Sequence, residues 1–171
     1  METTAVYFES RIRTYGFHLD RDLSLLEIRI DSKGPGLWGQ GLESLGAMGL
    51  RFNLVFAQIL EDYGFCVYVA LMRSATDRII EALNCRLVAS PVDILSFQGP
   101  HYKDRYGIAL EALKSLRSRD ISPTAFCCSV SCIYIVLEGG KGDAAHDILM
   151  ERFEVPPKNS RRKRASKKDG V

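Results

Sequence analysis

The architecture of this chain can be read from residues 92–137, VDILSFQGPHYKDRYGIALEALKSLRSRDISPTAFCCSVSCIYIVL. The short apolar run at 92–97 predicts a strand. Apolar residues then recur at helical spacing from Ile108 to Leu116, which predicts a helix that buries one face. The helix should end before Pro123, because the residue that precedes a proline avoids helical geometry. Apolar and β-branched residues in 124–137 predict two more strands, so the order is strand, helix, strand, strand.

The residues that follow predict a second helix and a last strand. Asp143 is a candidate N-cap, and the helix after it has an apolar stripe formed by Ala145, Ile148 and Leu149. The last strand is expected at residues 153–155. The complete unit therefore has the order strand, helix, strand, strand, helix, strand.

The same order is predicted in the first half of the chain. Strands are expected at 23–30, 50–59 and 65–72, with one helix whose stripe includes Trp38, Leu42 and Leu45 and a second helix at 76–83. A shift of 71 residues aligns Gly36 with Gly107, and the same shift aligns the whole of the first helix with its counterpart without a gap. This indicates an internal repeat. Residues 11–19 predict one more strand, joined by a turn at 20–22 to the strand at 23–30 as a hairpin. Which sheet it extends is left open.

We therefore predict an α+β fold of two βαββαβ units, each an antiparallel sheet with its helices on one face. The units are expected at 11–89 and 90–157, joined at Ser90 and Pro91. Because no long linker separates them, their sheets should pack side by side. Residues 158–171 are expected to form a disordered basic tail.

Composition excludes several classes of protein. The chain has 171 residues, 46% of them hydrophobic, which is enough for one ordinary domain or two small ones. No apolar stretch approaches the roughly 18 residues of a membrane helix, and residues 1–13 lack the pattern of a signal peptide. Five cysteines, most of them in predicted strands, suggest buried reduced thiols and a cytoplasmic protein.

Charge is distributed unevenly along the chain. Residues 158–171 carry seven basic side chains and one acidic one, so this tail has a net charge of +6. The whole chain has a net charge of +2, which leaves −4 for the remainder. The tail is therefore a candidate for sequence-independent binding of nucleic acid or of an acidic protein surface. A purely solubilising role is the alternative.

Two runs of sequence resemble the regulatory region of aspartokinase. The first is residues 15–58, YGFHLDRDLSLLEIRIDSKGPGLWGQGLESLGAMGLRFNLVFAQ, where the turn at 31–36 is similar to the family's Asp-Lys-Pro-Gly turn between strand and helix. The second is residues 97–137, where a Gly-Pro turn leads to a Tyr-Gly helix start and then to a strand with small polar residues around Ser129. This chain has an extra glycine in the first turn, and Tyr106 stands where the family has proline.

The resemblance implies a particular fold and role. Aspartokinase regulatory regions are pairs of ACT domains, ferredoxin-like βαββαβ modules that bind amino acids or other small effectors. The catalytic domain would precede them, and it has no counterpart in this chain. We therefore expect a non-enzymatic, free-standing ACT-domain regulator of amino-acid metabolism, a homodimer that acts on a metabolic enzyme. A scaffold with degenerate ligand sites, or a nucleic-acid-associated regulator that uses the tail, is the alternative.

The expected effector site is the turn between the first strand and the first helix. Free backbone N–H groups at a helix N-terminus favour a carboxylate, and glycine lets a ligand approach the backbone. The site residues that this reasoning and the resemblance indicate are Asp31, Lys33, Gly36, Leu37, Trp38 and Gln58. Asp31 is assigned to the ligand's amine and Gln58 to its amine or side chain. The alternative is that Gly36 only starts the helix and Asp31 only caps it.

The matching turn of the second unit is expected to be a solvated loop. Its candidate residues are His101, Asp104, Gly107 and Ser129. We expect no metal site, because neighbours such as Cys127 and Cys128 point to opposite faces of a strand, and no second Cys or His pair has zinc spacing. No cofactor and no catalytic residues are expected, because the chain nowhere combines a nucleophile, a base and an orienting group.

Overall fold

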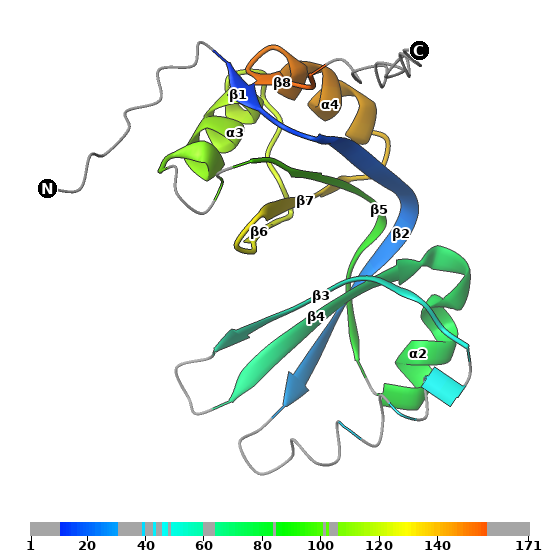
Figure 1. Cartoon of the computed structure of the whole chain (residues 1–171). Helices are drawn as coiled ribbons and strands as arrows, with labels where there is room; N and C mark the ends of the chain where they lie inside the picture. The colour runs from blue at the N-terminus through cyan, green and yellow to red at the C-terminus, as the bar shows by residue number, and fades with distance from the viewer. Residues whose placement is uncertain are drawn as a thin grey trace, which may run out of the picture.

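The computed structural model describes residues 11–30, 49–59, 64–83, 85–100, 102 and 106–156, together with the separate residues 39, 43, 46 and 47. Figure 1 shows the elements with their labels. Their bounds are β1 (Ile12–Arg13), β2 (Gly16–Ile30), β3 (Phe52–Ile59), β4 (Phe65–Met72), η1 (Arg73–Ala75), α2 (Thr76–Leu83), β5 (Arg86–Gln98), α3 (Ile108–Arg117), β6 (Ala125–Cys128), β7 (Cys132–Glu138), α4 (Gly142–Met150) and β8 (Phe153–Glu154).

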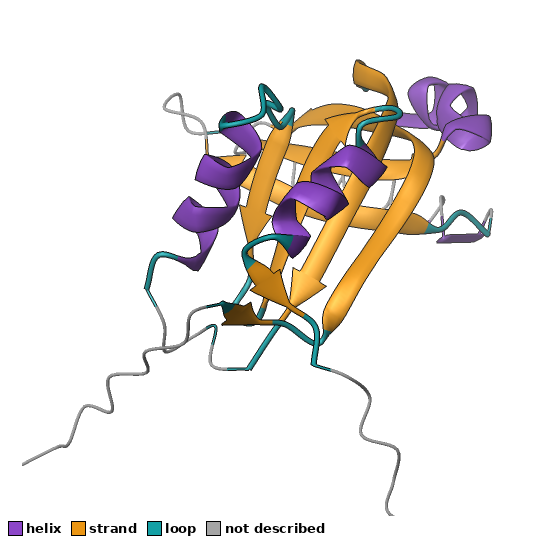
Figure 2. Ribbon diagram, turned by 90° about the horizontal axis from the view of Figure 1, so that it is seen from above, coloured by secondary structure: helices purple, strands orange, loops and turns teal. Residues whose placement is uncertain are grey.

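Six of the strands form one sheet in the order β3-β4-β2-β5-β7-β6, and every neighbouring pair is antiparallel. The long strands β2 and β5 run through the middle and belong to both halves (Figure 1). Helices α3 and α4 cover one half, whereas α2 packs on the other (Figure 2). The predicted α+β class, with antiparallel arrays side by side, is confirmed.

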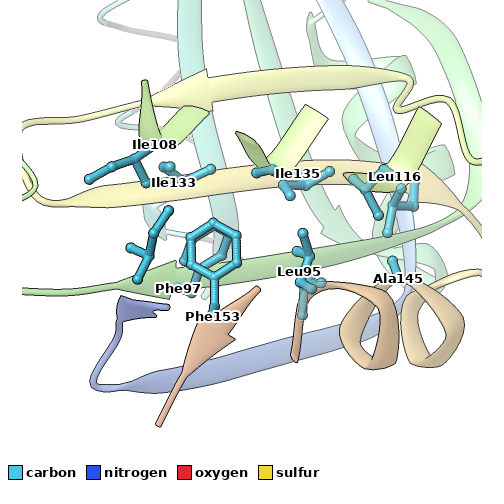
Figure 3. Close-up of a cluster of buried hydrophobic side chains, with 12 residues drawn as sticks. Leu95, Phe97, Ile108, Leu116, Ile133, Ile135, Ala145 and Phe153 are labelled. Atoms are coloured by element: carbon cyan, nitrogen blue, oxygen red, sulfur yellow. The ribbon is translucent and has the colours of Figure 1, made fainter. Parts of the chain in front are cut away.

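Three apolar clusters hold the layers together. The largest lies between α3, α4 and the strands β5 and β7, and its side chains interlock around Phe97 and Phe153 (Figure 3). A second cluster joins α2 to β2 and β4. The third cluster lies on the sheet face that the helices do not cover. It combines Leu54 and Ala70 from one half of the sheet with Ile94 and Val136 from the other half. The strongly bent sheet thus buries part of both its faces.

The hairpin predicted at residues 20–22 is wrong. β2 continues through these residues, and its pairing with β5 moves from Asp20 opposite Ile94 to Leu23 opposite Val92. The extra residue forms a bulge, in which Asp22 has φ 57°. Both parts of β2 hydrogen-bond to β5 and bury apolar side chains, so a bend satisfies the chain better than a reversal would. The first part, residues 16–20, lies beside 94–98, which settles which half of the sheet this segment extends.

The first and last of the described strands also pair. β1 and β8 pair in parallel, with Ile12 opposite Phe153, and both side chains are buried in the cluster around Phe97. Segments that lie about 140 residues apart in the sequence therefore share one core. The strand predicted at 153–155 is confirmed at Phe153–Glu154. The domain boundary near residue 90 stays a prediction, and β5 runs unbroken through Ser90 and Pro91.

The prediction that Asp143 caps the last helix is wrong. α4 begins one residue earlier, at Gly142, and the exposed Asp143 side chain pairs with Arg21 at 2.5 Å. The cap comes from the buried carboxylate of Asp93 on β5, whose Oδ2 accepts hydrogen bonds from the backbone N–H of Gly140 at 2.9 Å and of Gly142 at 3.0 Å. A remote strand residue therefore replaces the local cap.

The cysteines carry no disulfide among the described residues, and all five are free thiols. The expectation that they are buried holds for Cys66 but is wrong for Cys128, which is exposed because β6 ends there beside a turn. None of the helices described, α2, α3 or α4, combines the length and apolar character that a membrane crossing requires.

Candidate functional site

Most of the effector site predicted in the first unit lies outside the described residues. This holds for Asp31, Lys33, Gly36, Leu37 and Trp38. The sixth residue, Gln58, is described. It lies on the edge strand β3, opposite Cys66 of β4, and its side chain is exposed. Every second residue of a strand points to the same face of the sheet, so Gln58 lies on the same face as Phe56 and Leu54.

The predicted turn of the second unit is described in part. His101 and Asp104 lie outside the described residues. Gly107 immediately precedes α3 with φ 86°, a left-handed conformation that glycine adopts without strain, and its carbonyl accepts the N–H of Glu111 at 2.9 Å. No described side chain caps this helix. The N–H groups of its first turn are therefore oriented toward any anion that approaches the turn.

Ser129 has a structural role in the turn between β6 and β7. Its backbone N–H donates to the carbonyl of Cys132 at 2.8 Å, and its Oγ accepts the N–H of Cys132 at 3.2 Å. The side chain is exposed. The structure thus places Gly107 and Ser129 on separate loops, and among the described residues no hydrogen bond joins them.

A cavity that the sequence did not predict lies on the sheet face away from α3 and α4. Its volume is about 410 Å³, and it is lined by Tyr15, Gly16, Phe17, His18, Ser96, Phe97, Gln98, Cys132 and Tyr134. The strand register explains its polar character. His18, Ser96 and Tyr134 are neighbours across β2, β5 and β7, and Gly16, Gln98 and Cys132 form the adjacent row.

A period of two in the sequence carries the signal for this cavity. In β5, Ser96 alternates with the buried Leu95 and Phe97, and in β7, Tyr134 alternates with the buried Ile133 and Ile135. Polar positions between core positions indicate a strand face that is not covered by helices. What sequence reasoning lacked was the pairing that brings these polar rows together.

The cavity presents several hydrogen-bonding groups. A hydrogen bond with the Cys132 thiol, the charge that thiol would carry and partial burial all raise the pKa of Tyr134, so its phenol keeps its proton at neutral pH. His18 is oriented by Asp20, with Nε2 and Oδ1 3.2 Å apart. Such a lining suits a small polar molecule.

The thiols near this face do not form a metal centre. No group of three or more His, Cys, Asp or Glu side chains in the described residues could hold a metal ion. Burial raises the pKa of the Cys127 thiol to about 11, with a smaller contribution from Cys128, so the thiol stays protonated at neutral pH. Thiolates are the species that bind metals, and this site disfavours them.

Comparison with known proteins connects this geometry to one group of structures. No protein-family model matches the sequence, and no curated protein matches it. Solved structures do match. The regulatory subunit of aspartate kinase from Thermus thermophilus superposes with a TM-score of 0.67 at 14% identity, over 85% of this chain and 100% of that one. The chain has the fold of aspartate kinase regulatory regions.

Further structures agree. The regulatory subunit of aspartate kinase from Thermus flavus matches with a TM-score of 0.68 at 11% identity, over 81% of this chain and 97% of that one. Aspartate kinase from Synechocystis matches with a TM-score of 0.73 at 13% identity, over 84% of this chain but only 28% of that longer one. The resemblance predicted from the two turn regions is therefore confirmed for the fold.

Proposed function

We propose that this chain is an ACT-type regulator that binds an amino-acid effector and controls an enzyme of amino-acid metabolism, without catalysing a reaction itself. One observation carries the proposal. The fold matches the whole of a regulatory subunit of aspartate kinase, 100% of the Thermus thermophilus chain, and not merely a fragment of it. A match of this extent supports a regulatory role for this chain as well.

We place the effector at the turn that contains Asp31, Lys33, Gly36, Leu37 and Trp38, with Gln58 beside it. The arrangement at the other repeat supports this placement. There a left-handed glycine, Gly107, precedes a helix that no described side chain caps. Gly36 occupies the equivalent position in the sequence repeat. An effector carboxylate could therefore accept hydrogen bonds from the backbone N–H groups of the first helix turn that follows Gly36. The second turn stays the solvated loop of our prediction.

We also propose that two copies assemble. The outermost strand β3 hydrogen-bonds only to β4 among the described strands, and Val55 and Ile59 on it are 47% and 87% exposed. Such an edge is favourable for a second copy. An effector that binds one assembly state better than the other will shift the equilibrium between them. Thermodynamic linkage makes this coupling reciprocal. If the effector increases the affinity for the target enzyme by some factor, the enzyme must increase the affinity for the effector by the same factor.

Thermal unfolding of the full chain against each of the twenty amino acids tests the proposal. An amino acid at 100 times its dissociation constant should stabilise the protein by about 2.7 kcal/mol, a shift of several degrees in Tm. Asp31→Ala should abolish the response. Asp104→Ala, which removes a carboxylate of the second turn three residues before Gly107, is the control and should leave it unchanged.

Two outcomes would contradict the proposal. A chain that responds to no amino acid at millimolar concentration is not an amino-acid sensor. A response that Asp104→Ala removes and Asp31→Ala preserves would show that the effector binds the second turn. The distinction is sharp because both carboxylates lie in turns that precede the first helix of a repeat.

The charge asymmetry favours one second candidate, binding of nucleic acid by the tail. The tail carries +6 against −4 for the remainder of the chain. Filter binding of duplex DNA and of single-stranded RNA, titrated against salt, should show affinity that falls steeply with ionic strength and disappears when residues 158–171 are deleted. Affinity that survives the deletion would exclude the tail as its source.

A further inference from the structure

One buried carboxylate lies on the sheet face that the helices leave uncovered. Glu27 is on β2, between Tyr68 of β4 and Arg86 of β5, and its side chain is only 5% exposed. Two arginines bind it. Arg86 of β5 donates from Nη2 to Oε2 at 2.6 Å and from Nε to Oε1 at 3.3 Å, and Arg29 donates from Nε to Oε1 at 3.0 Å. The carboxylate therefore holds two guanidinium groups in fixed positions.

The carboxylate is ionised at every physiological pH. Hydrogen bonds from Arg86 lower the pKa of Glu27 from 4.5 to about 2; burial opposes this shift and Arg29 adds to it. The group of three thus carries one negative and two positive charges, a net charge of +1. Both cations share Oε1, so their like charges are close together and Glu27 neutralises only one of them.

The two guanidinium groups keep most of their donors free of Glu27. Arginine has five N–H donors, of which Arg29 uses the one on Nε and Arg86 uses one on Nε and one on Nη2. Their side chains are 74% and 62% exposed. No other hydrogen-bond acceptor within the described part of the chain binds either group. Most of the donors of both exposed guanidinium groups are therefore available to a ligand.

The neighbouring strand provides one wall. Tyr68 of β4 is directly opposite Glu27, and its ring stacks on Phe56 of β3 with centroids 4.8 Å apart. Phe56, Tyr68, Glu27 and Arg86 thus form one continuous row across β3, β4, β2 and β5. The stacked rings therefore lie on the side of Glu27 that is opposite to Arg86.

We propose that Arg29 and Arg86 form a binding site for a small oxyanion, a phosphate or a carboxylate, which bridges the two guanidinium groups on the side away from Glu27. Guanidinium groups match the paired oxygens of such anions, and fixed donors lose little conformational entropy on binding. The buried Glu27 positions both arginines. The site lies on β2 and β5, and neither arginine is among the residues assigned to the effector, so substitution of Arg29 or Arg86 tests it separately from the proposed function.

Isothermal titration of the full chain with inorganic phosphate and, in a second arm, with succinate tests the site. The titrations use a zwitterionic buffer at constant ionic strength. We expect saturable binding of one anion per chain in at least one arm, and the arm that responds identifies the kind of oxyanion. Arg29→Gln and Arg86→Gln should each weaken binding by tenfold or more. Arg73→Gln removes an exposed arginine that pairs with Asp22 at 3.1 Å, and it should bind as the natural chain does.

Arg29→Gln is the decisive variant, because Arg29 makes only one hydrogen bond to Glu27 and its loss perturbs the fold least. Far-UV circular dichroism and a cooperative unfolding transition establish that each variant is folded. Absence of saturable binding in both arms would overturn the proposal. So would equal affinity in Arg29→Gln and the natural chain, or an equal loss in Arg73→Gln, since either result would show only general attraction to positive charge.

Discussion

Truncation of Phe153 should destabilise the half of the protein that contains α3 and α4. Phe153 is fully buried, and it belongs to the two-residue strand β8. Its ring meets Phe97 at a centroid distance of 4.9 Å and Phe17 at 6.4 Å, both edge to face. Phe→Ala in a core costs about 3–5 kcal/mol, of which each aromatic pair supplies roughly 0.5–1.5 kcal/mol. The buried side chain of Ile12 on β1, which lies opposite Phe153, would also lose packing.

Urea unfolding followed by circular dichroism measures the effect. Phe153→Ala should lower the free energy of unfolding by about 3–5 kcal/mol, and Tm by about 10 °C for a protein of this size. The control is Tyr106→Ala, which truncates a fully exposed aromatic residue and should change the free energy by less than about 0.5 kcal/mol. A loss below 1 kcal/mol for Phe153→Ala would refute the packing of the C-terminal strand into this core.

Two further predictions concern buried carboxylates. Glu27→Gln should lower the free energy of unfolding at pH 7 by about 1–2 kcal/mol, because the pKa of Glu27 is lowered from 4.5 to about 2 and the exposed arginines reduce the full linkage value. The stabilisation is present above pH 4.5 and is lost as pH falls toward 2, so urea unfolding of the variant should depend less on pH in that range; an unchanged dependence would contradict the ion cluster. Asp93→Ala should cost about 2–4 kcal/mol, because the N–H groups of Gly140 and Gly142 lose a charged acceptor. Hydrogen exchange of these two amides should accelerate, and protection equal to that of the natural chain would rule out the cap.

Local patterns predicted the regular elements well. Helix α2 and strand β4 lie within the predicted bounds, and α3 buries Ile108, Ala112 and Leu116 as its apolar spacing requires. These elements are determined by neighbours three or four residues away on a helix, or two residues away on a strand, so one sequence contains the whole signal. The same holds for the order of elements in the two halves of the chain.

Long-range pairing was beyond such patterns. Residues 20–22 contain two aspartates and an arginine, a good local turn signal, yet β5 pairs with both sides of them and converts the turn into a bulge. Pro91 resembles a boundary, but the ladder between β2 and β5 is irregular there, so its missing N–H costs little and the strand continues. The cap that Asp93 supplies to α4 likewise depends on a contact almost fifty residues away in the chain.

The candidate sites also differ in whether the sequence alone reveals them. The turn around Gly36 is proposed from a repeat and a resemblance, both of which are present in the sequence. The Glu27 cluster requires Arg86, which is brought to it by strand register alone. The cavity beside Tyr134 requires three strands in register. A site built by side chains from several strands becomes visible only when the register is known.

Equilibrium dialysis of the full-length protein against an equimolar mixture of the twenty amino acids tests the proposed sensor without choosing an effector beforehand. The protein is used at a concentration above the expected dissociation constant, and the amino acids on both sides are quantified by chromatography. We predict that one amino acid, or a closely related pair, is retained on the protein side, and that Asp31→Ala abolishes the retention. An equal distribution of all twenty amino acids would contradict the proposal that this chain is an amino-acid-binding regulator.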